Sequence, residues 1–219
     1  MSEFDPYDEL KKQMAAAQER FASEVDGATM TVVKDDGLHR HLTFRFPKAS
    51  WEWCEIITWP GTLTLRGGLG CWSFTYDEDM LAFFRPGPHR ERIDPLHWAQ
   101  KLAPGSEVKE YDENRARAYV RQAVAEAVET HEHIRAEDAE DWLSSFDTEA
   151  ALMRTLGWVE GRVDAERPAG ATLEEYMASE FHFPVQDWDL YRWSNWFLLS
   201  CVVLPWAVEQ YDAALVPVG

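Results

Sequence analysis

The sequence contains few cysteines and no long apolar segment, and each shortage excludes a class of protein. Its three cysteines, Cys54, Cys71 and Cys201, are too few and too far apart for a disulfide framework, and none belongs to the CxxC pair of a zinc or redox site. The longest apolar run, residues 196–208, is shorter than the ~20 residues that a membrane-spanning helix needs. The first residues lack the apolar core of a signal peptide. We therefore expect a cytoplasmic protein with reduced thiols that binds no membrane.

Positive charge is also scarce. Lys and Arg total 21 against 39 Asp and Glu, which gives the 219-residue chain a formal net charge of −18. The excess is uneven, because residues 107–189 contain 21 acidic and 8 basic side chains. Such a surface repels the phosphates of nucleic acids and attracts basic protein surfaces. The sequence thus predicts no direct binding of nucleic acid. It favours a basic protein partner or, as the alternative, a charge that serves only solubility.

The chain does contain ample material for a folded core, since 46% of its residues are hydrophobic and 11 are tryptophan. Asp5-Pro6 has the pattern of a helix start, and we expect a helix from there to about Ser23. Alternation of apolar and polar residues then recurs through the next fifty residues, separated by turn sequences. The pattern predicts an α+β fold: one helix, a five-stranded antiparallel meander over about 28–76, and a mainly helical C-terminal half.

The alternation also assigns the two faces of the predicted sheet. Leu42, Phe44 and Phe46 fall on one face of the second strand, which we expect to be buried. The opposite, polar face receives four side chains of the same strand: His39, His41, Thr43 and Arg45. Arg66 and Cys71 of the fourth and fifth strands share this face if the strands pair in order.

The glycine-rich segment GGLG, residues 67–70, raises the question of a nucleotide-binding loop. A dinucleotide fingerprint needs G-x-G-x-x-G between a strand and a helix, and a P-loop ends in Gly-Lys-Ser or Gly-Lys-Thr. This segment has neither spacing and lies between two predicted strands. Glycine adopts positive φ without a steric cost, which a tight hairpin requires. We therefore interpret the segment as a turn.

The remainder of the chain reads as helices. Asp112 is placed to cap a long helix, and a last helix is expected to begin near Asp187 and to be kinked or ended by Pro205. We expect a first region, residues 1–105, with the first helix, the sheet and short helices. An acidic helical region, residues 106–219, is expected to pack on the sheet so that the two form one compact unit.

Parts of the strand region are similar to a known group of sequences. "LTFRFP", "EIITWPGTLTLRGGLGCWSFTYDEDMLAFFR" and "PLHWAQKL" resemble a family of uncharacterised proteins encoded by bacteriophages and prophages. The most specific part is Trp59-Pro60-Gly61, followed by the glycine turn and Trp72-x-Phe74. The resemblance spans roughly residues 38–102 and transfers no catalytic or binding residue. It implies a phage accessory gene concerned with host takeover or counter-defence.

No catalytic signature is present, so the sequence predicts no catalytic residue, metal or cofactor. An enzyme that processes a small molecule or a phosphoester remains an alternative. Its site would lie on the polar sheet face around His39, His41, Arg45 and Arg66. Two histidines of one strand face can bind a metal, but a metal site needs a third ligand, which the sequence does not show.

The leading hypothesis is a non-enzymatic inhibitor that binds a basic host protein, such as a nucleic-acid-binding or defence factor, by imitating nucleic acid. The acidic side chains predicted to contact it form one band: Glu126, Glu129, Glu132, Glu137, Asp138, Glu140 and Asp141. An ordinary solvated helix face would have the same composition. A third possibility is a structural homodimer.

Overall fold

The computed structural model describes residues 6–87, 93–130, 148–165 and 182–215, and it divides the chain into two compact units. The first, here called the sheet unit, comprises Met1–Val108 and Trp193–Gly219. The second, the inserted unit, comprises Lys109–Arg192. The sheet unit is therefore made of two stretches of sequence, one before and one after the inserted unit.

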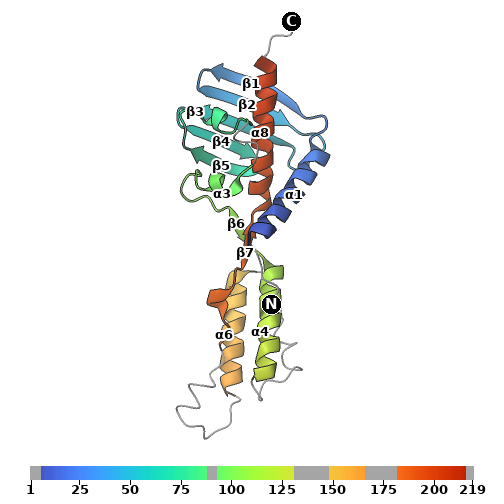
Figure 1. Cartoon of the computed structure of the whole chain (residues 1–219), viewed down its shortest axis with the longest axis vertical. Coiled ribbons are helices and arrows are strands. Elements are labelled where there is room, and N and C mark those ends of the chain that lie inside the picture. Colours follow the sequence, from blue (N-terminus) through green and yellow to red (C-terminus); the bar gives the residue numbers. More distant parts are fainter. Residues whose placement is uncertain (1–5, 88–92, 131–147, 166–181, 216–219) are drawn as a thin grey trace. The chain divides into compact units, whose positions relative to one another are not determined.

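The predicted α+β fold with its five-stranded antiparallel sheet is confirmed (Figure 1). The strands pair in chain order, each antiparallel to its neighbour. The sheet unit contains these elements in sequence: α1 (Pro6–Glu24), β1 (Thr29–Asp36), β2 (His39–Arg45), β3 (Trp53–Trp59), β4 (Thr62–Gly67), β5 (Gly70–Thr75), α2 (Met80–Phe83), α3 (Pro95–Ala99) and α8 (Asn195–Leu215).

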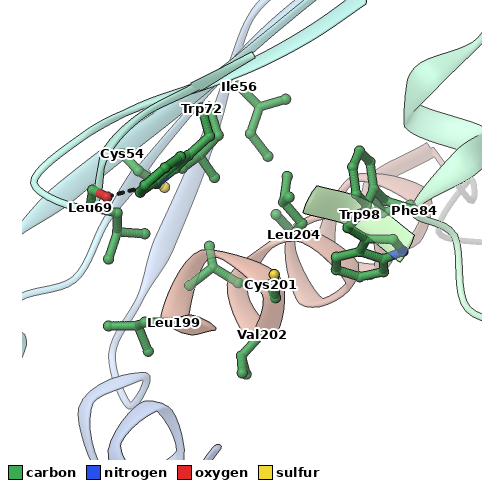
Figure 2. Close-up of a cluster of buried hydrophobic side chains, with 14 of the residues drawn as sticks. Cys54, Ile56, Leu69, Trp72, Phe84, Trp98, Leu199, Cys201, Val202 and Leu204 are labelled. Atoms are coloured by element: carbon green, nitrogen blue, oxygen red, sulfur yellow. Dashed lines mark hydrogen bonds between the residues drawn. The ribbon is translucent and has the colours of Figure 1, made fainter. Parts of the chain in front are cut away.

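One face of the sheet is buried beneath α1 and α8 (Figure 1). The sheet contributes the side chains that period-two alternation predicted, including Leu42, Phe44 and Phe74, which are fully buried. Helix α8 is apolar around most of its circumference, and eleven of its residues are buried, so it is a core element. Figure 2 shows this core, with Cys201 and Leu204 of α8 facing the sheet residues.

The glycine segment is a turn, as the sequence predicted. Gly67 ends β4 and Gly70 begins β5, and these two residues pair across the hairpin with φ of 135° and 96°. A Cβ atom on Gly68 would lie 2.0 Å from the carbonyl oxygen of Trp51. Leu69 is buried, and its carbonyl oxygen accepts a hydrogen bond of 2.9 Å from Trp72 Nε1 (Figure 2). The glycines therefore serve close backbone packing.

Helix α8 departs from the prediction at its start and at its proline. It begins at Asn195, eight residues later than expected, and continues ten residues past Pro205. A proline inside a helix costs roughly 3 kcal/mol or more. Burial of the residues on both sides of Pro205 offsets that cost.

The inserted unit contains the strand pair β6 (Lys109–Tyr111) and β7 (Tyr191–Trp193) and the helices α4 (Glu113–Thr130) and α6 (Glu149–Ala165). The predicted cap is confirmed, since the Asp112 carboxylate accepts hydrogen bonds from the first-turn backbone amides of α4. The unit has its own small core of mainly aliphatic side chains: Ala116, Val120, Ala123, Val124, Ala127, Leu152, Leu156, Val159, Phe183 and Leu190.

In the parts of the chain that the structure describes, no helix combines the length and the apolar composition needed to cross a membrane.

Candidate functional site

The sheet face that faces away from α1 and α8 has a polar surface, here called the open face. All of its side chains are exposed or half-exposed except that of Glu55. The strand register assigns it these residues: Thr29, Thr31, Lys34, Asp36, His39, His41, Thr43, Arg45, Trp53, Glu55, Ile57, Trp59, Thr62, Thr64, Arg66, Cys71, Ser73 and Thr75. The polar face inferred from the sequence is thus the solvent-facing side of the described sheet.

A carboxylate lies at the centre of the open face between a histidine and an arginine side chain. Glu55 of β3 is buried, with 7% of its surface exposed. Its Oε2 contacts His41 Nε2 from β2, and its Oε1 accepts hydrogen bonds from Arg66 of β4, at 3.0 Å from Nε and 2.8 Å from Nη2. Three neighbouring strands each contribute one member of this cluster, so the register of the sheet holds it together.

The cluster keeps Glu55 ionised. Burial alone would raise the pKa of this carboxyl, but the hydrogen bonds from His41 and Arg66, together with the Arg66 charge, outweigh it and bring the pKa below its ordinary value. A carboxylate that accepts the Nε2–H of an imidazole fixes the tautomer of that ring and leaves Nδ1 as the basic nitrogen. His41 is therefore held in the orientation of a proton acceptor.

The four predicted open-face residues do not form one group. His41 and Arg66 meet through Glu55. Arg45 instead lies over the ring of Trp53, with its guanidinium carbon 6.0 Å from the ring centroid. His39 is exposed two residues before His41, and its register partner on β1 is Asp36.

Sequence reasoning missed Glu55. The sequence does place it on the polar face, because Glu55 lies two residues from Trp53 and from Ile57 on β3, and residues two apart on a strand share a face. What the sequence could not supply was the register that places this carboxylate between His41 and Arg66.

The acidic band is described only in part. Glu126 and Glu129 lie exposed on α4, and Gln122 Nε2 donates a 2.9 Å hydrogen bond to Glu126 Oε1. Five members lie outside the described residues: Glu132, Glu137, Asp138, Glu140 and Asp141.

The cysteines differ in their surroundings. Cys54 and Cys201 are buried in the core, and burial raises the pKa of the Cys54 thiol to about 12 and that of Cys201 well above its ordinary value. Both thiols are therefore inert at neutral pH. Cys71 is exposed on the open face. Within the described ranges, no three or more His, Cys, Asp and Glu side chains gather to hold a metal ion.

Comparison with protein-family models, with curated proteins and with solved structures found no match to this chain. The chemistry of the two units is therefore the guide to function.

Proposed function

We propose that the chain is a phage-encoded inhibitor that binds a basic host protein through its inserted unit. The distribution of charge carries this proposal. Residues 109–192 contain 20 acidic and 9 basic side chains, whereas the longer sheet unit contains 19 acidic and 12 basic. A dense negative field on one unit attracts a basic surface and speeds its association. The phage origin and the host-takeover context belong to the proposal and come from the resemblance that the strand region suggests in sequence.

Within the inserted unit the negative charge is concentrated further. Helix α4 carries three acidic and three basic residues and is balanced. The excess falls in residues 131–147, with six acidic residues and one Arg, and in residues 166–181, with four acidic residues and one Arg. The partner is therefore expected to require the band that begins at Glu126 and extends to Asp141.

The test compares retention of a partner by two matched charge variants. Tagged wild-type protein is incubated with a nuclease-treated bacterial lysate, washed at low and at high salt, and its retained proteins are identified by mass spectrometry. We expect one basic protein in stoichiometric amount that high salt removes. The band variant replaces four residues with Lys: Glu137, Asp138, Glu140 and Asp141.

The control variant replaces four acidic residues of the sheet unit with Lys, namely Asp8, Glu9, Glu19 and Glu209. It carries the same change of net charge at other positions. The proposal requires that the band variant lose the partner and the control variant keep it. Equal retention by both variants would contradict it.

A second candidate function is supported by the cluster on the open face. A carboxylate-oriented imidazole beside a guanidinium suits an anionic ligand whose reaction requires proton transfer, and a phosphoester is such a ligand. The test is fluorescence anisotropy with a labelled single-stranded oligonucleotide. We expect Arg66→Gln to weaken binding at least several-fold, whereas Thr75→Ala, on the same face, leaves it unchanged.

A further inference from the structure

We propose that the open face cleaves single-stranded RNA by proton transfer, with His41 as general base and His39 as general acid. The inference rests on the second candidate function, a phosphoester site at this face, and names its substrate and reaction. Glu55 acts as a positioning residue, and Arg66 and Lys34 bind the phosphate.

The base is defined by the contact of His41 with Glu55. Because the Glu55 carboxylate accepts the Nε2–H of the ring, the free lone pair lies on Nδ1. The side chain of His41 is about one-third exposed, so a substrate hydroxyl can reach it. Glu55 is nearly inaccessible and is ionised, so it orients the ring and does not contact the substrate itself.

The acid is defined by strand geometry. His39 and His41 lie on the same face of β2, and the Cα atoms of residues two apart on a strand are separated by about 6.6 Å. General acid–base groups act within about 3 Å of the oxygens that they serve. Two imidazoles at this spacing can therefore serve the entering and leaving oxygens on opposite sides of one phosphorus atom. Asp36 is the register partner of His39 on β1, so the acid lies across the strand pair from a carboxyl-bearing residue.

Two cations are available for the phosphate. Arg66 contacts Glu55 through Nε and Nη2, and that contact leaves Nη1 for a ligand; its side chain is 53% exposed. Lys34 is the register partner of His41 on β1, with its side chain 57% exposed and its Nζ 3.7 Å from Asp36. The two cations lie on opposite sides of His41, which suits a phosphodiester that runs across the strands.

The open face also offers a surface for a base. Trp59, at the end of β3, is 41% exposed and lies on the same face as His39 and Thr62. Stacking of a nucleobase on an exposed aromatic ring is worth about 1–3 kcal/mol and tolerates any sequence. Single-stranded RNA is therefore favoured over a duplex, in which the bases are stacked on each other.

The site has a base, an acid and two cations, and it favours RNA over DNA because RNA carries its own nucleophile, the 2′-hydroxyl. His41 Nδ1 takes the proton of the 2′-hydroxyl, and the 2′-oxygen attacks phosphorus. The bond from phosphorus to the 5′-oxygen then breaks, and protonated His39 gives its proton to that oxygen. The products are a 2′,3′-cyclic phosphate and a free 5′-hydroxyl. One proton is taken up and one released, so the step balances without another reactant.

The inference departs from the expectation that the chain binds no nucleic acid. That expectation used the net charge of −18, but exposed charges beyond about 8 Å are largely screened at physiological salt. The open face itself carries Lys34, Arg45 and Arg66 against Asp36 and Glu55, and both acids lie beside cations. Its local balance is therefore positive even before the two histidines are counted.

The experiment incubates the full-length protein with a labelled single-stranded RNA 20-mer in EDTA between pH 5 and pH 8. We expect fragments with a cyclic phosphate end, identified by mass, and no cleavage of the same sequence as DNA or 2′-O-methyl RNA. His41→Gln and His39→Gln should each slow cleavage by ~100-fold or more. Thr75→Ala, prepared in parallel, should cleave at the wild-type rate. Intact RNA with the wild-type protein, or a wild-type cleavage rate in either histidine variant, overturns the inference.

Glu55→Gln tests the positioning role. The imidazole of His41 faces Lys34, Glu55 and, through Glu55, Arg66, and His39 is its neighbour on the strand. Loss of the carboxylate removes the group that orients the imidazole ring, so kcat should fall while KM stays near the wild-type value. A raised KM with an unchanged kcat would contradict this role.

A binding measurement separates the two levels of the proposal. Anisotropy with the 2′-O-methyl RNA reports binding without cleavage. Binding that Arg66→Gln weakens, in a protein that leaves RNA intact, would retain the phosphoester site and reject RNA cleavage. No binding would reject both.

Discussion

At the scale of single residues, one partly buried ion pair connects four elements of the sheet unit. Arg40 of β2 donates to both carboxylate oxygens of Asp79, at 2.9 and 3.1 Å, and Asp79 also caps α2 by accepting from backbone amides. The Arg40 guanidinium lies near the ring of Tyr211 of α8, whose hydroxyl donates to Asp35 of β1 at 2.8 Å. The side chain of Arg40 is only 12% exposed, so loss of Asp79 would leave a nearly buried charge unpaired.

Asp79→Ala should therefore lower the free energy of unfolding by about 2–4 kcal/mol. The loss combines a helix cap, worth about 1 kcal/mol, with the uncompensated charge of Arg40. Urea denaturation followed by circular dichroism measures it. Asp8→Ala, which removes an exposed ion pair with Lys11, should change stability by less than about 0.5 kcal/mol. A similar small change in both variants would show that the Arg40 pair is not stabilising.

The carboxyl groups of Asp79 and Glu55 determine how the stability of the sheet unit responds to acid. Burial alone would raise the pKa values of Asp79 and Glu55, but hydrogen bonds from Arg40, and from His41 and Arg66, outweigh it and lower both. A carboxyl whose pKa is lower in the folded state stabilises the protein above its unfolded pKa, and that contribution is lost as the pH falls through the folded value. Stability should therefore decrease below about pH 4.5, and less steeply in a variant with Asp79→Asn and Glu55→Gln. Denaturation midpoints of both proteins between pH 2 and pH 7 test this. The same dependence of the midpoint on pH in the wild type and in the double variant would contradict it.

At the scale of elements, the sheet was predictable and the ends of the last helix were not. Alternation of apolar and polar residues is a local signal, and it located all five strands and both faces. The extent of α8 depends on tertiary packing, because its apolar stretch and Pro205 read locally as an interrupted helix. The open-face cluster was predictable only in part, because it too depends on contacts between strands that are distant in sequence. Residue types identified His41 and Arg66, while only the register reveals Glu55 between them.

The β4–β5 hairpin provides an element-scale test. Gly68→Ala should prevent native packing or lower the free energy of unfolding by at least about 3 kcal/mol. Its Cβ would lie 2.0 Å from the Trp51 carbonyl oxygen, a backbone atom that cannot rotate away. Gly37→Ala is the matched control, because nothing lies within 4 Å of its Cβ and only its φ of 60° is strained, at a cost of about 1–2 kcal/mol. Thermal denaturation measures the stability of the two variants, and we expect Gly68→Ala to be the less stable. A lower stability of Gly37→Ala would contradict this.

At the scale of the whole molecule, the chain leaves the sheet unit after Val108 and returns at Trp193. The two points are adjacent, since Ser194 N donates a 2.8 Å hydrogen bond to the Val108 carbonyl oxygen. Sequence order suggested two consecutive regions. The structure instead places α8 in the first core, because the apolar face of the sheet and the apolar helix cover each other.

The sheet unit should fold without the insertion. A variant in which Asn-Gly replaces residues 109–192 keeps the backbone contact between Val108 and Ser194 and connects it by a two-residue turn. We expect cooperative thermal unfolding and dispersed amide resonances in an NMR spectrum. The same variant should retain any activity of the open face and lose the basic partner. A molten or aggregated product would show that the inserted unit is needed for the sheet unit to fold.

The adjacency of Val108 and Ser194 also determines how a mechanical load would pass through the molecule. A pull on the inserted unit reaches the sheet unit at two neighbouring backbone points, joined by one hydrogen bond. Because β6 and β7 are hydrogen-bonded neighbours, the two crossings share such a load and the pair is not pulled apart. All five strands of the sheet precede the first crossing, and α8 follows the second. The load therefore enters the sheet unit outside the sheet.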